Sequence, residues 1–544
     1  MLTQNPQEDI LQTENLSISD SDLLTQKVGS FRFVKQNWPL ILLTVLAYLG
    51  RLATVPDFIE SRDGLLFLRG IEHYSVVELR PQWPGYPVYI WAGKLFGLLY
   101  NNPILALHMV SILASTLTLW PIAKLALLWY RFLKPGESSH ANWVGLTAAL
   151  AWVLLPLSWL GGSEIFSDPL GLLIGLTFFW LACRSIENRP GSALSLPVAG
   201  LLAGLMLGTR LSYLVLLLPL VYAVWINRSQ PVFGWKKGPL LLPLAVALCF
   251  GLAVTLWLGW QLLMDGWKYF QAGDTHLVGH YTEWGGSVST DKNILTRPLR
   301  MFETLAVYGL GSWWPGLSFT RLPTTFGLLA LLVSGTATLA RRKLSPPLLM
   351  ALLWVGPYFA WILLGNDVDL ARYEFPLVAL LCILVGLGLP SRKWVKILAI
   401  PVISLCMALV TVPQALEHHT HPPVGEQLAT YASQNSGDAA FIVNDDTSPL
   451  IFFLVDEAPE SYSLRVATPD LEKETANLEK SGHTVYVTAL PGTALPGNNW
   501  VPVARFCRGK FMESRGPLEV WLYQHNPAAT ASLAPLQCEP YQAG

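Results

Sequence analysis

Long apolar runs, separated by short polar segments, dominate the chain between residues 38 and 413. The runs lie at 38–55, 104–130, 142–158, 169–186, 197–209, 211–226, 239–264, 322–340, 347–364, 375–390 and 394–413. A helix needs about 20 apolar residues to cross a bilayer. The pattern therefore predicts a mainly helical, polytopic membrane bundle of about 11 transmembrane helices. The pair at 197–209 and 211–226 is short enough to count as one span or two.

Three segments depart from this pattern. Residues 86–100 form a shorter apolar stretch with Lys94 inside it, which suits a juxtamembrane or re-entrant helix better than a full span. Residues 414–544 are richer in charge. They hold short β-like runs at 439–443, 484–488 and 519–523 and a helical stretch at 468–482, which together predict a small α/β domain. Residues 1–37 are polar and predict a cytoplasmic tail.

Composition supports the membrane assignment and excludes other classes. The chain of 544 residues is 52% hydrophobic and only 13% charged, against roughly 25% charged in an ordinary soluble domain. A single soluble globule, a disordered chain and a coiled coil are therefore excluded. The formal net charge of −1 provides no field that would attract nucleic acid, so no nucleic-acid partner is expected.

The few basic residues gather in alternate short loops, and this distribution predicts the orientation. Examples are Arg131 with Lys134, Arg184, Arg228, and Arg392 with Lys393. By the positive-inside rule these loops and the N-terminus are cytoplasmic, which places the C-terminal α/β domain outside the cytoplasm. We expect the inner or plasma membrane of a bacterium. The exterior loops at 57–103 and 265–321 are long, which favours chemistry on that side.

Acidic residues mark the junctions between exterior loops and spans. Glu60 and Asp63 follow the first span, and Glu164 and Asp168 precede the fourth. A carboxylate in such a partly dehydrated position can act as a general base. The alternative is a structural one, since Asp63 also fits the first turn of a helix, where its charge favours the N-terminus.

Two arginines could contact an anionic group on the same side. Arg372, followed by Tyr373, lies in a short exterior loop, and Arg210 lies between two spans. An arginine beside a span is costly without a partner. The alternatives are pairing of Arg372 with Asp367 or Asp369, and extension of Arg210 to the membrane interface.

The loop 274–293 concentrates histidine and aromatic residues. His276 and His280 are four residues apart and Glu283 follows, a spacing that could bind a metal on a helix. Gly279 and the pair Gly285–Gly286 argue against a firm helix, so no metal is expected. The loop is then either a plain solvated segment or a mobile loop whose His280, Tyr281 and Trp284 contact a sugar or an acceptor.

The remaining candidates lie near the C-terminal domain. His418, His419 and His421 follow the last span and are expected at the membrane interface rather than as ligands. Cys507 and Cys538 could form a disulfide in an oxidising compartment. Cysteine spacing matches no metal motif, and no cofactor is indicated.

Several of these features together resemble the GT-C superfamily of membrane glycosyltransferases, in particular the protein O-mannosyltransferase and aminoarabinose-transferase-like branch. The shared features are an acid after the first span, a proline-rich entry to a juxtamembrane helix, an LFG exit and a late exterior Arg-Tyr. Residues 95–97 are LFG. Residues 82–89, QWPGYPVY, approach the motif HPPGYPLY of a second branch of the superfamily, with Gln82-Trp83 in place of His-Pro. The chain lacks an Asp-Glu pair at the first-loop position.

The resemblance implies an enzyme that takes a sugar from a polyprenyl-phosphate donor. Its first-loop acid falls on Asp63, or on Glu60, and its second-loop acid on Glu164 or Asp168. The implied reaction is an inverting displacement at the anomeric carbon, with a carboxylate as base and cations on the departing phosphate. Membrane lipid and an exterior acceptor (a lipid, a glycan or a protein) are the implied partners.

Three other classes remain as alternatives, one of them a catalytically inactive assembly protein that binds through its C-terminal domain. A lipid or sugar transporter or flippase would need paired repeats and charges inside the spans, and neither is obvious in the sequence. A polymer ligase would use a lipid-diphosphate donor in a related reaction. The oligomeric state, the sugar and the acceptor are not determined by the sequence.

Overall fold

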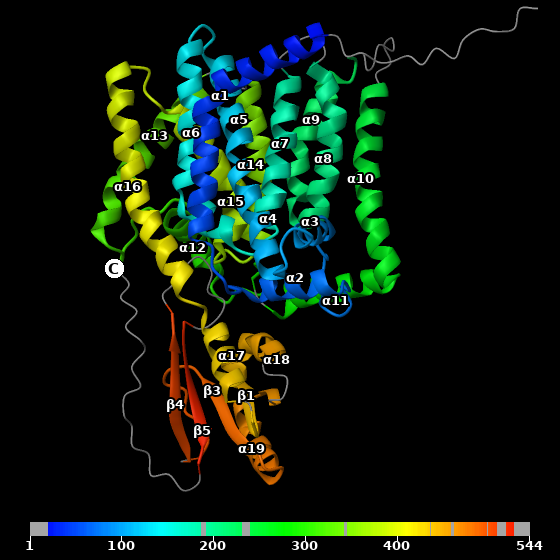
Figure 1. Ribbon diagram of the computed structural model, residues 1–544, viewed down its shortest axis with the longest axis vertical. Coiled ribbons are helices and arrows are strands. Elements are labelled where there is room, and N and C mark those ends of the chain that lie inside the picture. The colour runs from blue at the N-terminus through cyan, green and yellow to red at the C-terminus, as the bar shows by residue number, and fades with distance from the viewer. Residues whose placement is uncertain are drawn as a thin grey trace, which may run out of the picture.

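The computed structural model describes residues 20–186, 192–230, 240–284, 286–341, 345–435, 437–457, 462–497, 499–508 and 518–526. Its larger part is a bundle of helices, and a smaller α/β domain lies at one end of that bundle (Figure 1). We call this end of the bundle the domain side.

The bundle combines long and short helices. They are α1 (Asp20–Ala53), α4 (Pro103–Leu117), α5 (Leu119–Leu133), α6 (Ser138–Leu154), α7 (Asp168–Ser185), α8 (Ser195–Thr209), α9 (Leu218–Asn227), α10 (Leu241–Asp265), α13 (Leu322–Ala340), α14 (Pro346–Gly365), α15 (Phe375–Leu387) and α16 (Lys393–Thr420). Within the described chain, five helical stretches are long and apolar enough to cross a membrane: Pro103–Leu133, Leu241–Asp265, Phe319–Ala340, Pro346–Gly365 and Lys393–Gln434. The chain is thus a multi-pass membrane protein, and the count of about 11 spans stays a prediction.

Two helices extend beyond the limits expected from hydropathy. Helix α1 begins at Asp20, inside the segment predicted to be a polar tail. Helix α16 continues to Thr420, past the expected boundary at residue 413, and contains Pro413. A proline inside a membrane helix is tolerated where neighbouring groups satisfy the backbone carbonyl that it leaves free. The extension places His418 at the domain side of the bundle.

Close helix contacts depend on small residues in the bundle. A Cβ atom added to Gly335 of α13 would lie 1.9 Å from the carbonyl oxygen of Leu384 in α15, and one added to Gly388 would lie 1.9 Å from that of Leu331. These two helices can approach so closely only because both positions lack a side chain. Elsewhere large side chains fill the interior: the ring of Phe179 stacks on that of Trp354, with centroids 4.5 Å apart.

Four shorter helices lie on the domain side: α2 (Arg62–Glu72), α3 (Pro87–Gly97), α11 (Lys268–Thr282) and α12 (Arg297–Thr304). In Figure 1, α2 and α11 run across the ends of the long helices. Helix α3 has 11 residues, too few to span a bilayer, as expected for the 86–100 stretch.

The C-terminal domain is a five-stranded sheet with helices. Its elements are α17 (Val424–Gln434), β1 (Ala439–Asn444), α18 (Ile451–Glu457), β2 (Tyr462–Val466), α19 (Leu471–Lys480), β3 (Thr484–Ala489), β4 (Trp500–Cys507) and β5 (Glu519–His525). The strand order is β2-β1-β3-β5-β4, with β1 parallel to β2 and β3, and β5 antiparallel to β3 and β4. Strands β1, β3 and β5 and helix α19 match the predicted elements. Strand β4 escaped prediction because Pro502 interrupts its pattern, and the pairing register shifts just after it.

The domain contacts the bundle through α2. The guanidinium of Arg62 lies 3.9 Å from the centre of the Phe452 ring of α18, and Arg69 donates a hydrogen bond to the carbonyl oxygen of Phe452 at 3.3 Å. The C-terminal domain therefore packs on the same helix that carries Asp63.

Candidate active site

Helix α2 fixes Asp63 at its first turn. Ser61 precedes the helix in an extended conformation, and its hydroxyl accepts a hydrogen bond from the backbone N–H of Gly64 at 3.1 Å. This is an ordinary N-terminal cap, which holds the start of the helix and favours a negative charge there. The prediction that Asp63 lies near a helix N-terminus is confirmed.

Arg372 is the partner of Asp63. It lies in the short turn Ala371–Glu374, which precedes α15, and its Nη1 is 2.8 Å from Asp63 Oδ2. Burial alone would raise the pKa of the Asp63 carboxyl. The charge and hydrogen bond of Arg372, together with the charges of Arg62 and Arg210, outweigh burial, so the pKa lies below its ordinary value. Asp369, one of the two alternative partners considered for Arg372, pairs with Arg300 instead.

A second pair lies beside the first. Asp168 is the first residue of α7 and Arg210 follows the last residue of α8, and Arg210 Nη1 lies 2.8 Å from Asp168 Oδ2. The ring of Tyr373 connects the pairs, because its centre is 5.1 Å from the Arg210 guanidinium and 5.4 Å from that of Arg372. Arg210 is thus internal rather than extended to the interface. We call Asp63, Asp168, Arg210, Arg372 and Tyr373 the arginine–aspartate cluster.

The two carboxylates of this cluster differ in access. A quarter of the Asp63 side chain is exposed, whereas only 1% of the Asp168 side chain is. An acceptor group from outside could reach Asp63 but not Asp168. Asp63 is therefore the carboxylate of the cluster that can exchange a proton with a bound molecule.

Tyr86 belongs to the same region and was not among the predicted site residues. Burial raises the pKa of the Tyr86 hydroxyl. The charges of Arg210 and Arg372 oppose this effect, and the charge of Asp63 adds to it. Its backbone has a φ of +47°, a left-handed conformation that is uncommon for a residue other than glycine. The sequence signal was the PGYP segment itself, which places Tyr86 between Gly85 and Pro87.

The other two predicted acids form a separate cluster with a histidine and an arginine. His418 Nε2 lies 2.6 Å from Glu164 Oε1 and 3.5 Å from Glu60 Oε2, and Arg508, which follows β4, pairs with Glu60. All four side chains are at most 6% exposed. We call this group the glutamate–histidine cluster. The expectation that His418 is merely interfacial was wrong, because α16 continues far enough to bury it between the segments that carry Glu60 and Glu164.

The glutamate–histidine cluster could hold a metal ion. One ligand atom each from Glu60, Glu164 and His418 lie within 4.8 Å of one another, the only such group among the residues the structure describes. Two carboxylates and an imidazole suit zinc. In the structure these groups neutralise one another together with Arg508, and Arg508 and His418 lower the pKa of Glu60 against the opposing effect of burial. That the site binds no metal stays a prediction.

The histidine-rich segment is helical, contrary to expectation. Helix α11 includes His276, His280 and Tyr281, and Gly279 does not break it because the indole of Trp284 packs directly against that position. The His280 ring forms a hydrogen bond with the carbonyl oxygen of Gly365 at 2.7 Å. The His276 ring lies between two indoles, with its centre 5.6 Å from that of Trp83 and 5.2 Å from that of Trp284. Burial, with a smaller contribution from His280, lowers the pKa of His276, and the charge of Asp63 acts in the opposite direction.

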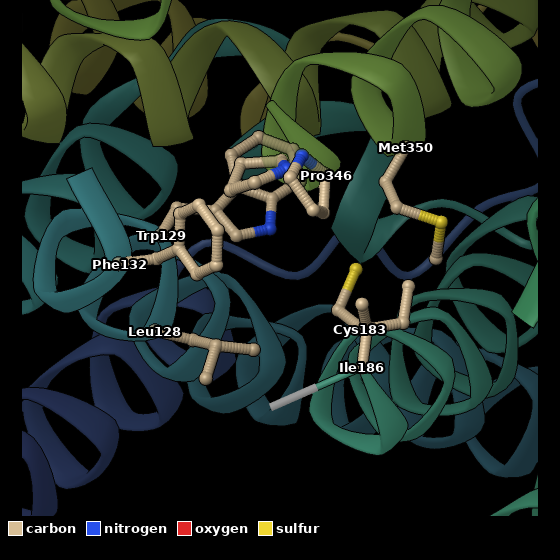
Figure 2. A pocket seen from close by; sticks show the side chains of 8 residues that line it. Leu128, Trp129, Phe132, Cys183, Ile186, Pro346 and Met350 are labelled. Carbon is tan, nitrogen blue, oxygen red and sulfur yellow. The ribbon is translucent and has the colours of Figure 1, made fainter. Parts of the chain in front are cut away.

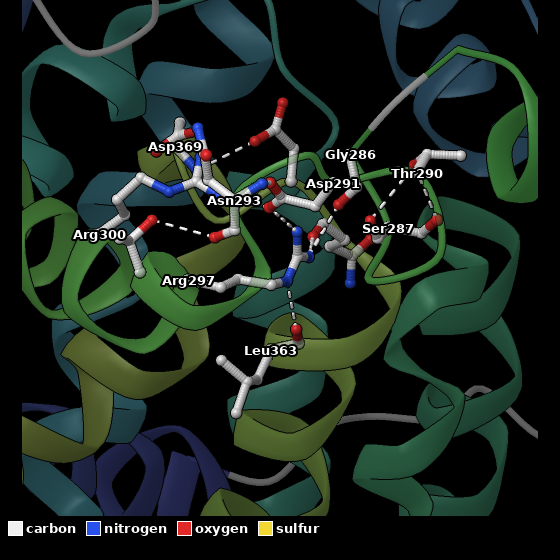
Figure 3. A network of polar contacts seen from close by, with 12 residues as sticks. Gly286, Ser287, Thr290, Asp291, Asn293, Arg297, Arg300, Leu363 and Asp369 are labelled. Carbon is white, nitrogen blue, oxygen red and sulfur yellow. Dashed lines mark hydrogen bonds and ion pairs between the residues drawn. The ribbon is translucent and has the colours of Figure 1, made fainter.

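A polar network holds the loop that carries Arg372 (Figure 3). Arg297 pairs with Asp291 at 2.6 Å and donates hydrogen bonds to the carbonyl oxygens of Leu363 and Gly286 at 2.6 and 2.8 Å. Arg300 pairs with both Asp291 and Asp369. The network joins the 286–300 segment to the 363–369 segment, just before Arg372. Neither arginine was predicted. Both share the nearby Asp291, but their bonds to Leu363 and Asp369 join positions 66 and 69 residues apart, which the sequence pattern does not reveal.

A small apolar cleft of about 20 Å³ lies between α5, α7 and α14 (Figure 2), near the end of α7 opposite to Asp168. None of the eight described residues that line it is charged; they include Trp129, Cys183 and Met350. Cys183 is 15 residues along α7 from Asp168, or about 22 Å at 1.5 Å per residue. The cleft therefore takes no part in the chemistry of the arginine–aspartate cluster.

One predicted feature falls partly outside the described residues. Cys507, at the end of β4, is disulfide-bonded. Cys538 lies outside the described residues, so the pairing of these two cysteines stays a prediction.

Comparison with known proteins identifies the fold. No protein-family model and no curated protein sequence matches the chain. ArnT from Cupriavidus metallidurans in the apo state has a TM-score of 0.54 and 13% identity, over 90% of this chain and 98% of that one. ArnT bound to undecaprenyl phosphate has a TM-score of 0.52 and 14% identity, over 91% and 99%. The oligosaccharyltransferase of Archaeoglobus fulgidus scores 0.45 at 12% identity, over 84% and 70%. The similarity to ArnT confirms the GT-C-type fold that the motifs predicted.

Proposed function

We propose that the protein is a membrane glycosyltransferase that moves a sugar from a polyprenyl-phosphate donor to an acceptor hydroxyl. The acceptor oxygen bonds to the anomeric carbon as the bond from that carbon to the phosphate oxygen breaks. The acceptor proton passes to Asp63, and the bonding electrons leave with the polyprenyl phosphate. A single displacement of this kind inverts the anomeric centre, and no cofactor is needed for it.

The observation that carries the proposal is an accessible carboxylate placed beside two buried guanidinium groups. Asp63 is reachable from outside, and Arg372 and Arg210 lie within the same cluster. A general base must be reachable by the proton that it accepts. Arginine suits a departing phosphate, because its planar group offers several charge-assisted hydrogen bonds without losing its own proton.

The lipid class of the donor is supported by the fold comparison. ArnT, which shares this fold over nearly its whole length, has been solved bound to undecaprenyl phosphate. A transmembrane bundle with its charged cluster at one end can hold a prenyl chain among apolar helices while the phosphate meets the arginines. The orientation we propose has the N-terminus in the cytoplasm and the cluster and C-terminal domain outside, in the inner or plasma membrane.

Purified full-length protein in lipid nanodiscs provides the test. Labelled polyprenyl-phosphate sugars are supplied with candidate lipid, glycan and peptide acceptors, and release of polyprenyl phosphate is measured with wild type and Asp63→Asn. Release that requires Asp63 is expected. Failure of the wild-type protein to bind or cleave any such donor would overturn the proposal.

Two alternatives give different results in the same system. A flippase or transporter would move the intact labelled donor across a vesicle membrane without cleaving it. A polymer ligase would consume a lipid-diphosphate donor and leave the monophosphate donor untouched.

A further inference from the structure

Arg372 is the group best placed to bind the donor phosphate, and Asp63 is the group best placed to act as base. In the structure these two residues already form an ion pair. Arg372 donates to Asp63 at 2.8 Å, and 9% of the Arg372 side chain is exposed. A carboxylate whose oxygen accepts a bond from a guanidinium is a weaker proton acceptor than one without it. In this arrangement the base is masked by its own neighbour.

We infer that the donor phosphate takes Arg372 from Asp63 and so frees the carboxylate for the acceptor, an inference that rests on the proposed function. The exchange involves no covalent change. Arg372 keeps its proton, Asp63 stays ionised, and only the partner of the guanidinium changes. The base is then exposed only when a donor is in place, which limits unproductive reaction with water.

Charge within the cluster favours this exchange. Two guanidinium groups and two carboxylates sum to zero, so a bound phosphodiester leaves one negative charge in excess. The excess charge is least costly on the carboxylate that contacts solvent, because desolvation penalises a buried anion most strongly. That carboxylate is Asp63, a quarter exposed, whereas Asp168 is almost fully buried and remains with Arg210.

Aromatic rings can hold Arg372 in place during the exchange. Its guanidinium lies 5.1 Å from the centre of the Phe166 ring and 5.4 Å from that of Tyr373. Such contacts attract a cation with no carboxylate involved. Arg372 therefore does not depend on Asp63 alone for its position, and the pair can open without displacing the arginine.

Direct binding measurements test the inference without any sugar or turnover. The probe is a fluorescent short-chain polyprenyl phosphate, titrated into wild-type protein and the variants Asp63→Asn and Asp63→Ala in nanodiscs at one salt concentration. If phosphate must displace Asp63, both variants bind the probe at least about tenfold more tightly than wild type, although both lose turnover. A gain of affinity at a position needed for activity is not expected from a merely structural role.

A matched control separates exchange from a general change in charge. Asp369→Asn removes a negative charge three residues before Arg372, but Asp369 pairs with Arg300, which keeps Asp291 as a partner. We expect this variant to bind the probe within about twofold of wild type. In the background of Arg372→Ala, Asp63→Asn should no longer raise affinity.

The outcomes distinguish this inference from the proposed function. Equal or weaker binding of the probe by both Asp63 variants, with wild-type binding intact, would overturn the exchange and leave glycosyl transfer standing. Equal gains from Asp63→Asn and Asp369→Asn would also overturn it, since charge alone would then explain the effect. Absence of probe binding by wild type and every variant would overturn both.

Discussion

Two clusters of four charges lie on the domain side of the bundle, and the same two loops supply the acids of both. The first loop provides Glu60 and Asp63, and the second provides Glu164 and Asp168. In each loop the earlier acid joins the glutamate–histidine cluster and the later one joins the arginine–aspartate cluster.

The clusters differ in their cations and in their access to solvent. The cations of the arginine–aspartate cluster both come from the bundle, and a quarter of Asp63 is exposed. In the glutamate–histidine cluster His418 comes from the last bundle helix and Arg508 from the C-terminal domain, and every member is buried. A general base must be reachable by the proton that it accepts, and no member of the buried glutamate–histidine cluster is. We therefore propose that the first cluster carries the chemistry and that the second attaches the domain.

The largest expected effect separates Asp63 from Glu60. We expect Asp63→Asn to lower turnover by at least about a hundredfold, the usual contribution of a general base, with little change in melting temperature. Glu60→Gln should keep turnover within a few fold and lower the melting temperature instead. Initial-rate assays and thermal unfolding of both variants check this.

The reverse pattern would exchange the two assignments. If Glu60→Gln abolished turnover with an unchanged melting temperature, Glu60 would be the base, which was the second choice from sequence. If Glu60→Gln lost turnover and added zinc restored it, a metal site in the glutamate–histidine cluster would be identified instead.

The next effect concerns the attachment of the domain. Arg508→Met leaves Glu60 buried with one cation fewer, and breaking a buried pair in this way costs about 3 kcal/mol. The matched control is Arg505→Met, three residues earlier in β4, because the Arg505–Glu519 pair is about 30% exposed and such pairs contribute about 0–1 kcal/mol. Denaturant unfolding of the full-length protein, followed by domain-specific fluorescence, measures both.

A smaller effect is expected in the loop network of Figure 3. Arg300 is 29% exposed and shares its charge between Asp291 and Asp369. We expect Arg300→Met to lower the free energy of unfolding by about 1 kcal/mol or less. A loss comparable to that of Arg508→Met would show that exposure does not separate these ion pairs.

The smallest expected effect is the absence of a titration near neutral pH. The pKa of Asp63 is lowered from its ordinary value of 3.8. A lowered carboxyl pKa means that the ion pair stabilises the protein at higher pH and that this contribution is lost as the pH falls through the folded-state value. Between pH 5 and 8, kcat/KM should therefore show no acidic limb from Asp63. An acidic limb near pH 6 that disappears in Asp63→Asn would contradict the low pKa.

Residues at loop–span junctions were predictable because charge is scarce in this chain. Asp63, Asp168, Arg210 and Arg372 stood out in a sequence that is 13% charged, and the structure brings all four together. The role of His418 was not predictable, because hydropathy gave no reason to extend α16 past Pro413. The helical state of α11 was missed because a glycine weakens a helix on average, while the packing of Trp284 on Gly279 depends on the tertiary structure.

The sequence by itself determined that this is a multi-pass helical membrane protein with a small α/β domain, because hydropathy and strand patterns depend on neighbouring residues. Its short motifs also identified the GT-C-type fold. Only the tertiary structure decided which acid pairs with which cation. Arg508 meets Glu60 across 448 residues of chain, and Asp63 and Asp168 remain distinct only because one contacts solvent and the other does not. Pairing and access are properties of the packed molecule, and they decide which of four similar carboxylates can carry a proton.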